Sequence, residues 1–152
     1  MSGSGGRELT FRPLEPCDIQ TISLVHHRAC LIAYRFMNWS YSLQEVEAWY
    51  SRIFTGWTRT LAMFDADVMM GFIALTDRHI DQLYVDPSYQ RRGVGSSLLD
   101  RALGNASGQA TLHVFEANGS ARAFYEKHGF RQQDRWMNTE EGAIDLLYVR
   151  EA

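Results

Sequence analysis

The sequence lacks a long hydrophobic run, and that absence excludes a membrane-spanning helix. None of its apolar stretches approaches the roughly 20 residues that cross a bilayer, although 45% of its 152 residues are hydrophobic. It also lacks an excess of basic residues, because its net charge is −3 with neutral histidines. That charge leaves no electrostatic footprint for nucleic acid or for an anionic membrane surface, so neither is expected as a partner.

Cysteine is scarce as well. The two cysteines, Cys17 and Cys30, lie too far apart for a CxxC motif and have no companions that would complete a zinc site. A disulfide between them stays open, but two small reduced thiols in a cytoplasmic protein are favoured. The pair His26-His27 has no third ligand at a useful spacing. The sequence therefore predicts no metal site and a cytoplasmic location.

Internal repeats and low-complexity segments are absent too, which favours a single domain. A chain of 152 residues can bury roughly 70% of its unfolded surface and is too short for two ordinary domains. Residues 1–6, MSGSGG, are expected to form a flexible tail outside the fold, and no signal peptide is expected. Residues 7–152 are expected to form the domain.

The most informative segment that is present is LYVDPSYQRRGVGSSLL, residues 83–99. It begins as the end of a buried strand, turns at Asp86-Pro87, and resumes with helical spacing at residues 97–103. The turn therefore opens a helix. The N-terminus of a helix presents unpaired N–H groups and a partial positive charge, so the turn is predicted to hold an anion such as a diphosphate.

Two glycines and two arginines distinguish this turn. Gly93 and Gly95 let the main chain approach a ligand, while Arg91 and Arg92 add positive charge. A P-loop is excluded because no lysine follows Gly95, and a dinucleotide fingerprint is excluded because Leu98 stands where a third glycine would be. A solvated surface turn is the remaining alternative to a phosphate-binding role.

A second strand-to-helix segment, ANGSARAFYEKHGF, covers residues 117–130 and follows an apolar strand at residues 110–115. Asn118 is a good N-cap, and Gly129 fits the position just after a helix end. This segment and QRRGVG, residues 90–95, resemble two motifs of the GNAT superfamily of N-acetyltransferases. The chain is identified as a member of that family on these two motifs, each in the required strand-to-helix context.

The hydrophobic pattern of the whole chain predicts a mixed α/β fold with the order β-α-α-β-β-β-α-β-α-β-β. Strands are expected at residues 8–14, 59–64, 68–76, 79–85, 110–115, 132–137 and 144–150, and helices at residues 18–34, 42–54, 97–103 and 121–127. Asp18 and the capping box Ser42-x-x-Glu45 mark the starts of the first two helices. The order resembles the GNAT fold, which implies a mostly antiparallel sheet of about seven strands, with the fourth and fifth splayed apart, and about four helices.

The resemblance implies acetyl-coenzyme A as the cosubstrate. In the family the glycine-rich turn binds the pyrophosphate, and the pantetheine arm bonds to the backbone of the fourth strand inside the splay. The cofactor-binding residues implied here are Leu83, Tyr84, Val85, Gln90, Arg91, Arg92, Gly93, Val94, Gly95, Ser96, Asn118 and Tyr125.

Acetyl transfer to an amine needs a base. An alkylammonium has a pKa of about 10 and must lose a proton before its nitrogen can attack the thioester. His79 and Asp81 are two residues apart in an expected strand, so their side chains share one face. Asp81 is expected to orient the ammonium or hold a water, and His79 to accept the proton. An exposed turn at residues 78–79 and a water relay are the alternatives, while His113 is expected to be an ordinary strand residue.

The departing thiolate needs a proton donor. The resemblance implies Tyr125, on the helix of the second motif, as the general acid near the sulfur of coenzyme A. The alternative is an aromatic that packs with Phe124 and Phe130. Asn118 is expected to cap the helix and to contact the pantetheine arm or an ordered water.

The acceptor is not determined by these motifs. Aromatic residues in the linker 34–42 favour an apolar or aromatic-lined pocket. Glu140-Glu141 with Asp145 form either a solvated turn or an acidic loop that attracts a cationic acceptor. The leading function is acetylation of a primary amine of a small-molecule or amino-acid-like acceptor by direct attack. A protein N-terminal or lysine acetyltransferase and a non-catalytic acyl-CoA sensor are the alternatives, and a homodimer stays open.

Overall fold

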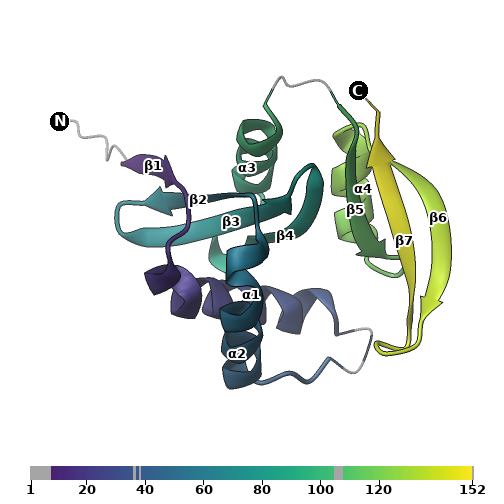
Figure 1. The fold of residues 1–152 in the computed structure, drawn as a ribbon, viewed down its shortest axis with the longest axis horizontal. Coiled ribbons are helices and arrows are strands. Elements are labelled where there is room, and N and C mark those ends of the chain that lie inside the picture. Colours follow the sequence, from purple (N-terminus) through teal and green to yellow (C-terminus); the bar gives the residue numbers. More distant parts are fainter. Residues whose placement is uncertain (1–7, 36, 38, 105–107, 152) are drawn as a thin grey trace.

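A computed structural model of the protein describes residues 8–35, 37, 39–104 and 108–151. These residues form one seven-stranded sheet in the order β1-β2-β3-β4-β5-β7-β6, with helices on both faces (Figure 1). The strands are β1 Leu9–Arg12, β2 Arg59–Asp65, β3 Val68–Thr76, β4 His79–Val85, β5 Ala110–Phe115, β6 Arg131–Asn138 and β7 Ala143–Arg150. The helices are α1 Ile19–Ala33, α2 Leu43–Ile53, α3 Val94–Leu103 and α4 Gly119–Lys127, with short 3-10 turns η1 Pro16–Asp18, η2 Phe54–Gly56 and η3 Pro87–Tyr89. The mixed fold and the order of elements expected from the sequence are confirmed.

Three helix termini follow the local rules that the sequence displays. Ser42 Oγ accepts from the Glu45 N–H at 3.1 Å, and Glu45 Oε1 accepts from the Ser42 N–H at 3.0 Å, which completes the capping box of α2. Asn118 Oδ1 accepts from the Ala121 N–H at 3.3 Å at the start of α4. Gly129, with a φ of 91°, follows the end of α4, as expected.

The start of α1 differs from the expectation. Asp18 precedes α1 but does not cap it with its side chain. Its carboxylate accepts from the Glu15 N–H at 2.7 Å and from both terminal nitrogens of Arg12 at 2.8 and 2.9 Å. A bidentate, charge-assisted pair is stronger than a single capping bond, so Asp18 joins β1 to η1 instead. The hydrogen bond from Arg12 accordingly lowers the pKa of Asp18.

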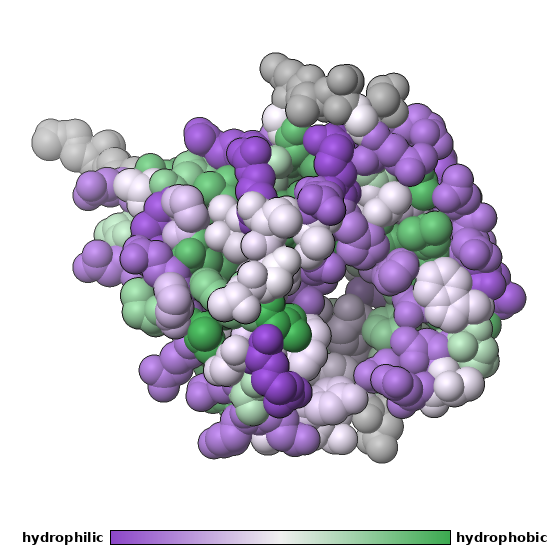
Figure 2. Space-filling view, viewed as in Figure 1, coloured by the Kyte–Doolittle hydropathy of each residue, from purple (hydrophilic) through white to green (hydrophobic). Residues whose placement is uncertain are grey.

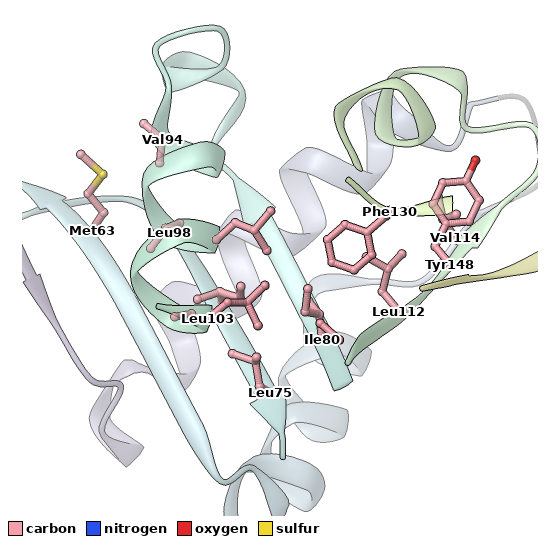
Figure 3. Packing of buried hydrophobic residues seen from close by; sticks show 14 of the residues in the cluster. Met63, Leu75, Ile80, Val94, Leu98, Leu103, Leu112, Val114, Phe130 and Tyr148 are labelled. Atoms are coloured by element: carbon pink, nitrogen blue, oxygen red, sulfur yellow. The ribbon is translucent and has the colours of Figure 1, made fainter. Parts of the chain in front are cut away.

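Two hydrophobic cores lie on opposite faces of the sheet. On one face Leu98 of α3 and Leu75 of β3 belong to one core, which continues past β4 to Phe130 after α4 (Figure 3). On the other face α1 and α2 pack against the sheet, and Tyr50 of α2 lies with Phe72 of β3. All five of these side chains are at most 1% exposed. Burial of each such side chain contributes roughly 1.5–3 kcal/mol, so both faces hold the sheet in place.

Strands β4 and β5 pair only at their beginnings. His79 lies opposite Thr111 and Ile80 opposite Leu112 in parallel register, whereas β4 pairs with β3 along its length. A shift in the β3 ladder leaves Asp81 as an extra residue, which is a β-bulge that bends β4. The expected splay is confirmed, and it opens the carboxyl-terminal half of β4 on the side that faces β5.

The remaining expectations concern the two cysteines, membrane-spanning helices and the extent of the domain. Both cysteines are free; Cys17 is exposed and Cys30 is buried. No helix in the described part of the chain is long and apolar enough to cross a membrane. Residues 1–6 lie outside the described residues, so the flexible tail and the single domain over residues 7–152 stay predictions.

Candidate active site

The turn rich in arginine and glycine runs directly into α3. Gly93 is the N-cap, with a φ of 77°, and the helix begins at Val94, three residues before the expected start. Arg91 also has a positive φ, of 65°, which a non-glycine residue rarely adopts and which makes the turn compact. The guanidinium of Arg92 lies 5.5 Å from the centre of the Tyr89 ring. The N–H groups of the first helical turn have no carbonyl partner within the helix, so this terminus suits a pyrophosphate.

Two side chains of the turn position it against its neighbours. Gln90 Nε2 donates to the carbonyl oxygen of Val85 at 3.4 Å, at the end of β4. Ser96 Oγ lies 2.9 Å from Nε2 of His128, which follows α4. In this structure Gln90 and Ser96 therefore connect the turn to β4 and to α4.

The strand edge beside the turn suits the pantetheine arm. Leu83 and Val85 pack toward the core under α3, and Tyr84 packs toward the core under α1 and α2. In the described part of the chain, β5 pairs with no residue of β4 after Ile80. An amide-bearing arm can therefore bond to the main chain of residues 83–85, which are only partly buried and do not pair with β5.

Tyr125 lies in α4 among aromatic rings. Its ring centroid is 5.1 Å from that of Phe124 and 5.7 Å from that of Phe130. Burial raises the pKa of Tyr125, so the phenol keeps its proton at working pH. The residue thus has the packing of a core aromatic and the protonation state that a general acid needs.

The two base candidates lie on β4 in different surroundings. Asp81 Oδ2 accepts from Thr76 Oγ1 at 2.5 Å, and His79 Nδ1 lies 2.7 Å from Thr111 Oγ1. Burial lowers the pKa of His79, with nearby His113 adding to the effect and Asp81 opposing it. His79 is therefore neutral at pH 7 and can accept a proton.

An inner chamber of about 360 Å³ opens at the splay. Figure 2 shows the surface hollowed between the half that carries β1–β4 and the half that carries β5–β7. Asp81 and Tyr84 of β4 line this chamber, together with Tyr34 from the end of α1. His113 lines it as well. His79 is not among the described lining residues, and its ring centroid lies 5.0 Å from that of His113. His113 lies in β5, as expected, and its position beside the inner chamber is a finding that the sequence did not indicate.

An outer chamber of about 590 Å³ adjoins the inner one between α2 and the β6–β7 loop. The two chambers share the lining residues His26, Trp39, Trp49 and Glu141. Tyr41 and Glu45 also line the outer chamber, and the Tyr41 hydroxyl donates to Glu141 at 3.1 Å.

The outer chamber combines aromatic rings with an excess of negative charge. Among the described residues that line it, Glu45, Glu140 and Glu141 stand against one cation, Arg52. Carboxylates and aromatic faces both attract an alkylammonium, so the chamber suits a cationic guest. Of the aromatics expected in the linker, residue 36 lies outside the described residues. No group of three or more His, Cys, Asp or Glu side chains within the described residues is placed to hold a metal ion.

Sequence reasoning missed three polar residues next to the chambers. His26 Nδ1 lies 2.5 Å from the hydroxyl of Tyr50, and that hydroxyl donates to Gln82 Oε1 at 3.5 Å. Burial lowers the pKa of His26 to about 3. The burial of His26 could have been predicted from the sequence, because this residue shares the apolar face of α1 with Ile22 and Ala29 at helical spacing.

Comparisons with known proteins agree with this geometry. A family model for the acetyltransferase (GNAT) domain matches residues 30–147. The chain is 31% identical over 129 residues to the uncharacterized N-acetyltransferase YafP of Escherichia coli, a match that covers 81% of each chain. The chain belongs to the GNAT family of acetyltransferases, whose cosubstrate is acetyl-coenzyme A.

Two further likenesses are informative. Over 75 residues the chain is 40% identical to the peptidyl-lysine N-acetyltransferase YjaB of Salmonella typhimurium, which covers 49% of this chain and 51% of that protein. The chain thus matches about half the length of that relative. The structure of the PaiA N-acetyltransferase of Thermoplasma acidophilum in complex with coenzyme A has a TM-score of 0.72 at 19% identity, and the match covers 95% of this chain and 99% of that chain.

Gly95→Asp tests the placement of the pyrophosphate. A Cβ at residue 95 meets the Phe124 ring at 3.3 Å, so any side chain there strains the contact between α3 and α4. Gly95→Ala carries that strain without charge and is the control. We expect Gly95→Asp to weaken acetyl-CoA binding at least tenfold beyond Gly95→Ala, because the carboxylate repels the phosphates. Calorimetric titration measures both, and equal affinities for the two variants would contradict the assignment.

Proposed function

We propose that the protein transfers the acetyl group of acetyl-CoA to the primary amine of a small cationic acceptor by direct attack in a ternary complex. The observation that supports this most is the pair of joined chambers. The inner chamber borders the open edge of β4, where the thioester would lie, and the outer chamber offers carboxylates and indole rings to an ammonium group. An acceptor held in the outer chamber can extend an amine into the inner one.

Direct attack is favoured over a covalent acetyl-enzyme. Cys30 lines the inner chamber, but burial raises the pKa of its thiol to about 12. Since the thiolate is the nucleophile, this cysteine is unreactive at working pH. The amine then attacks the thioester carbonyl itself, a proton leaves its nitrogen, and the thiolate of coenzyme A departs.

A second candidate is acetylation of peptidyl lysine. The likeness to YjaB over 75 residues favours it, because that relative is named as a peptidyl-lysine N-acetyltransferase. A lysine side chain is itself an alkylammonium, so the same chambers could accept it.

Tyr125→Phe tests the general acid. The change keeps the ring that packs with Phe124 and Phe130 and deletes only the hydroxyl. We expect kcat to fall about 10²-fold with little change in acetyl-CoA affinity, because the thiolate then departs without a proton. Stopped-flow measurement of thiol release separates chemistry from product release. An unchanged chemical step would assign Tyr125 to the core alone.

His79→Gln and Asp81→Asn test the base. If His79 accepts the proton, His79→Gln slows the reaction more at pH 7 than at pH 9, because free amine becomes abundant at high pH. Asp81→Asn is expected to raise the acceptor KM if the carboxylate orients the ammonium, and to lower kcat if it is the base. Identical pH profiles and acceptor constants in both variants and the wild type would leave a water relay as the account of deprotonation.

The acceptor class is tested by thiol release with matched amines. We expect 1,4-diaminobutane to have a lower KM than n-butylamine, because its second ammonium can occupy the acidic outer chamber. Glu141→Gln should raise the KM for the diamine about three- to tenfold and leave n-butylamine almost unchanged. Asp67→Asn, at the exposed β2–β3 turn, removes one charge away from the chambers and is the control.

Two results would redirect this assignment. A lysine peptide that outperforms every free amine would favour the second candidate. Absence of thiol release with any amine or peptide, in a protein that binds acetyl-CoA, would overturn the catalytic function in favour of an acyl-CoA sensor.

A further inference from the structure

His26 lies where the two chambers meet, although it belongs to the buried face of α1. The residue is 7% exposed and lines both chambers. Its ring centroid is 4.2 Å from that of Tyr84, 5.3 Å from that of Tyr50 and 6.0 Å from that of Trp49. Burial of a polar ring destabilises the folded protein unless both of its nitrogens have hydrogen-bond partners.

One ring nitrogen of His26, Nδ1, has a partner in the hydroxyl of Tyr50. The Tyr50 hydroxyl has a single hydrogen, which it donates to Gln82 Oε1. With that hydrogen directed to Gln82, the Tyr50 oxygen accepts from His26 and Nδ1 carries the proton, which is the tautomer that the inference below requires and that the NMR experiment tests. In a neutral imidazole with a protonated Nδ1, Nε2 has a free lone pair. Tyr50 and Gln82 are 0% and 9% exposed, so solvent hardly competes for this chain of hydrogen bonds.

The other nitrogen, Nε2, is the one that can serve a ligand. Among the described residues no hydrogen-bond partner of His26 Nε2 exists, and no fully buried side-chain nitrogen or oxygen among them lacks a partner. Nε2 must therefore be accessible, and the space beside His26 is the junction of the two chambers. A lone pair at this junction can accept a hydrogen bond from a molecule that occupies it.

Burial also decides what His26 cannot do. It lowers the pKa of the imidazole to about 3, so His26 remains neutral at any working pH. The ring accepts a hydrogen bond without taking the proton, which leaves deprotonation to another group. Its role thus differs from that of His79 and Asp81.

We infer that His26 is a specificity-determining residue of the acceptor site, whose Nε2 accepts a hydrogen bond from one N–H of the attacking amine. The inference rests on the proposed acetyl transfer to an amine. A neutral primary amine has two N–H bonds and one lone pair. One N–H bonds to His26, which leaves the lone pair free to turn toward the thioester.

This hydrogen bond selects primary over secondary amines. When the amine attacks, the N–C bond forms, the C–S bond breaks, and the nitrogen of a primary amine briefly carries two hydrogens. One proton leaves to the base, the thiolate gains a proton, and the other N–H remains on His26 in the amide product. A secondary amine has only one hydrogen at that stage, so it must break the bond to His26 in order to lose its proton. The contacts around His26 thus favour primary amines as the substrate class.

A pair of substitutions separates this role from packing. The amide of Asn reaches about as far as Nδ1 and that of Gln about as far as Nε2, so His26→Asn keeps the contact with Tyr50 and His26→Gln keeps a polar atom toward the chambers. We expect His26→Asn to raise the amine KM about tenfold without changing the acetyl-CoA KM, and His26→Gln to restore part of the loss. The preference for n-butylamine over N-methylbutylamine should shrink in His26→Asn.

Three results would overturn the inference. One is an unchanged amine KM in His26→Asn. Another is an equal rise of the amine KM in His26→Asn and His26→Gln together with a loss of thermal stability in both. That result would mean that the imidazole serves only to pack the core. The third is an undiminished preference for the primary amine in His26→Asn.

Nitrogen NMR of the histidine-labelled protein with coenzyme A bound needs no catalysis. We expect a neutral ring with the proton on Nδ1, no titration between about pH 5 and 8, and a shift of the Nε2 resonance when 1,4-diaminobutane is added. A proton on Nε2, or no response to the diamine, would overturn the inference even if thiol release is normal. A shifted Nε2 resonance without any thiol release would instead support the inference as a binding site and overturn the proposed catalysis.

Discussion

The two-residue ladder between β4 and β5 is the constraint on which the site depends. His79 and Ile80 pair with β5, and the strands then separate while the core beneath them stays continuous. The main chain of residues 83–85 is consequently open toward β5 in a part of the molecule that is otherwise closely packed. Backbone groups that do not pair with β5 there can bond to a ligand, so an arm that carries amides is a natural occupant. The same separation leaves room for the inner chamber.

Helix α1 connects the chambers proposed for the acceptor with the turn proposed for the cosubstrate. One turn of the helix buries Ile22 in the core and brings His26 to the chambers. Further along, Arg28 pairs with Asp86 at 3.1 Å, just after β4 and before the phosphate-binding turn. Asp86 is buried while the Arg28 side chain is partly exposed, and the pair ties the acceptor side to the cosubstrate side.

Short-range features could be predicted from the sequence because neighbouring residues decide them. The capping box of α2, the Asn118 cap and Gly129 after α4 all involve partners within four positions. Expectations were wrong where a distant partner competed, as when Arg12, six positions away, took the carboxylate of Asp18. The bulge at Asp81 was missed since it depends on the register with β3, which the pattern of β4 alone does not contain.

The sequence by itself determined the family, the order of elements and the turn that opens α3, because each depends on local patterning and on a motif read along one segment. Only the tertiary structure decided the acceptor site. His26 meets Tyr50 across 24 positions, and Tyr50 meets Gln82 across 32. No local preference brings these residues together; the packing of α1 and α2 on one face of the sheet does. The suppressed protonation of His26 follows from that burial, which is a property of the packed molecule rather than of any segment.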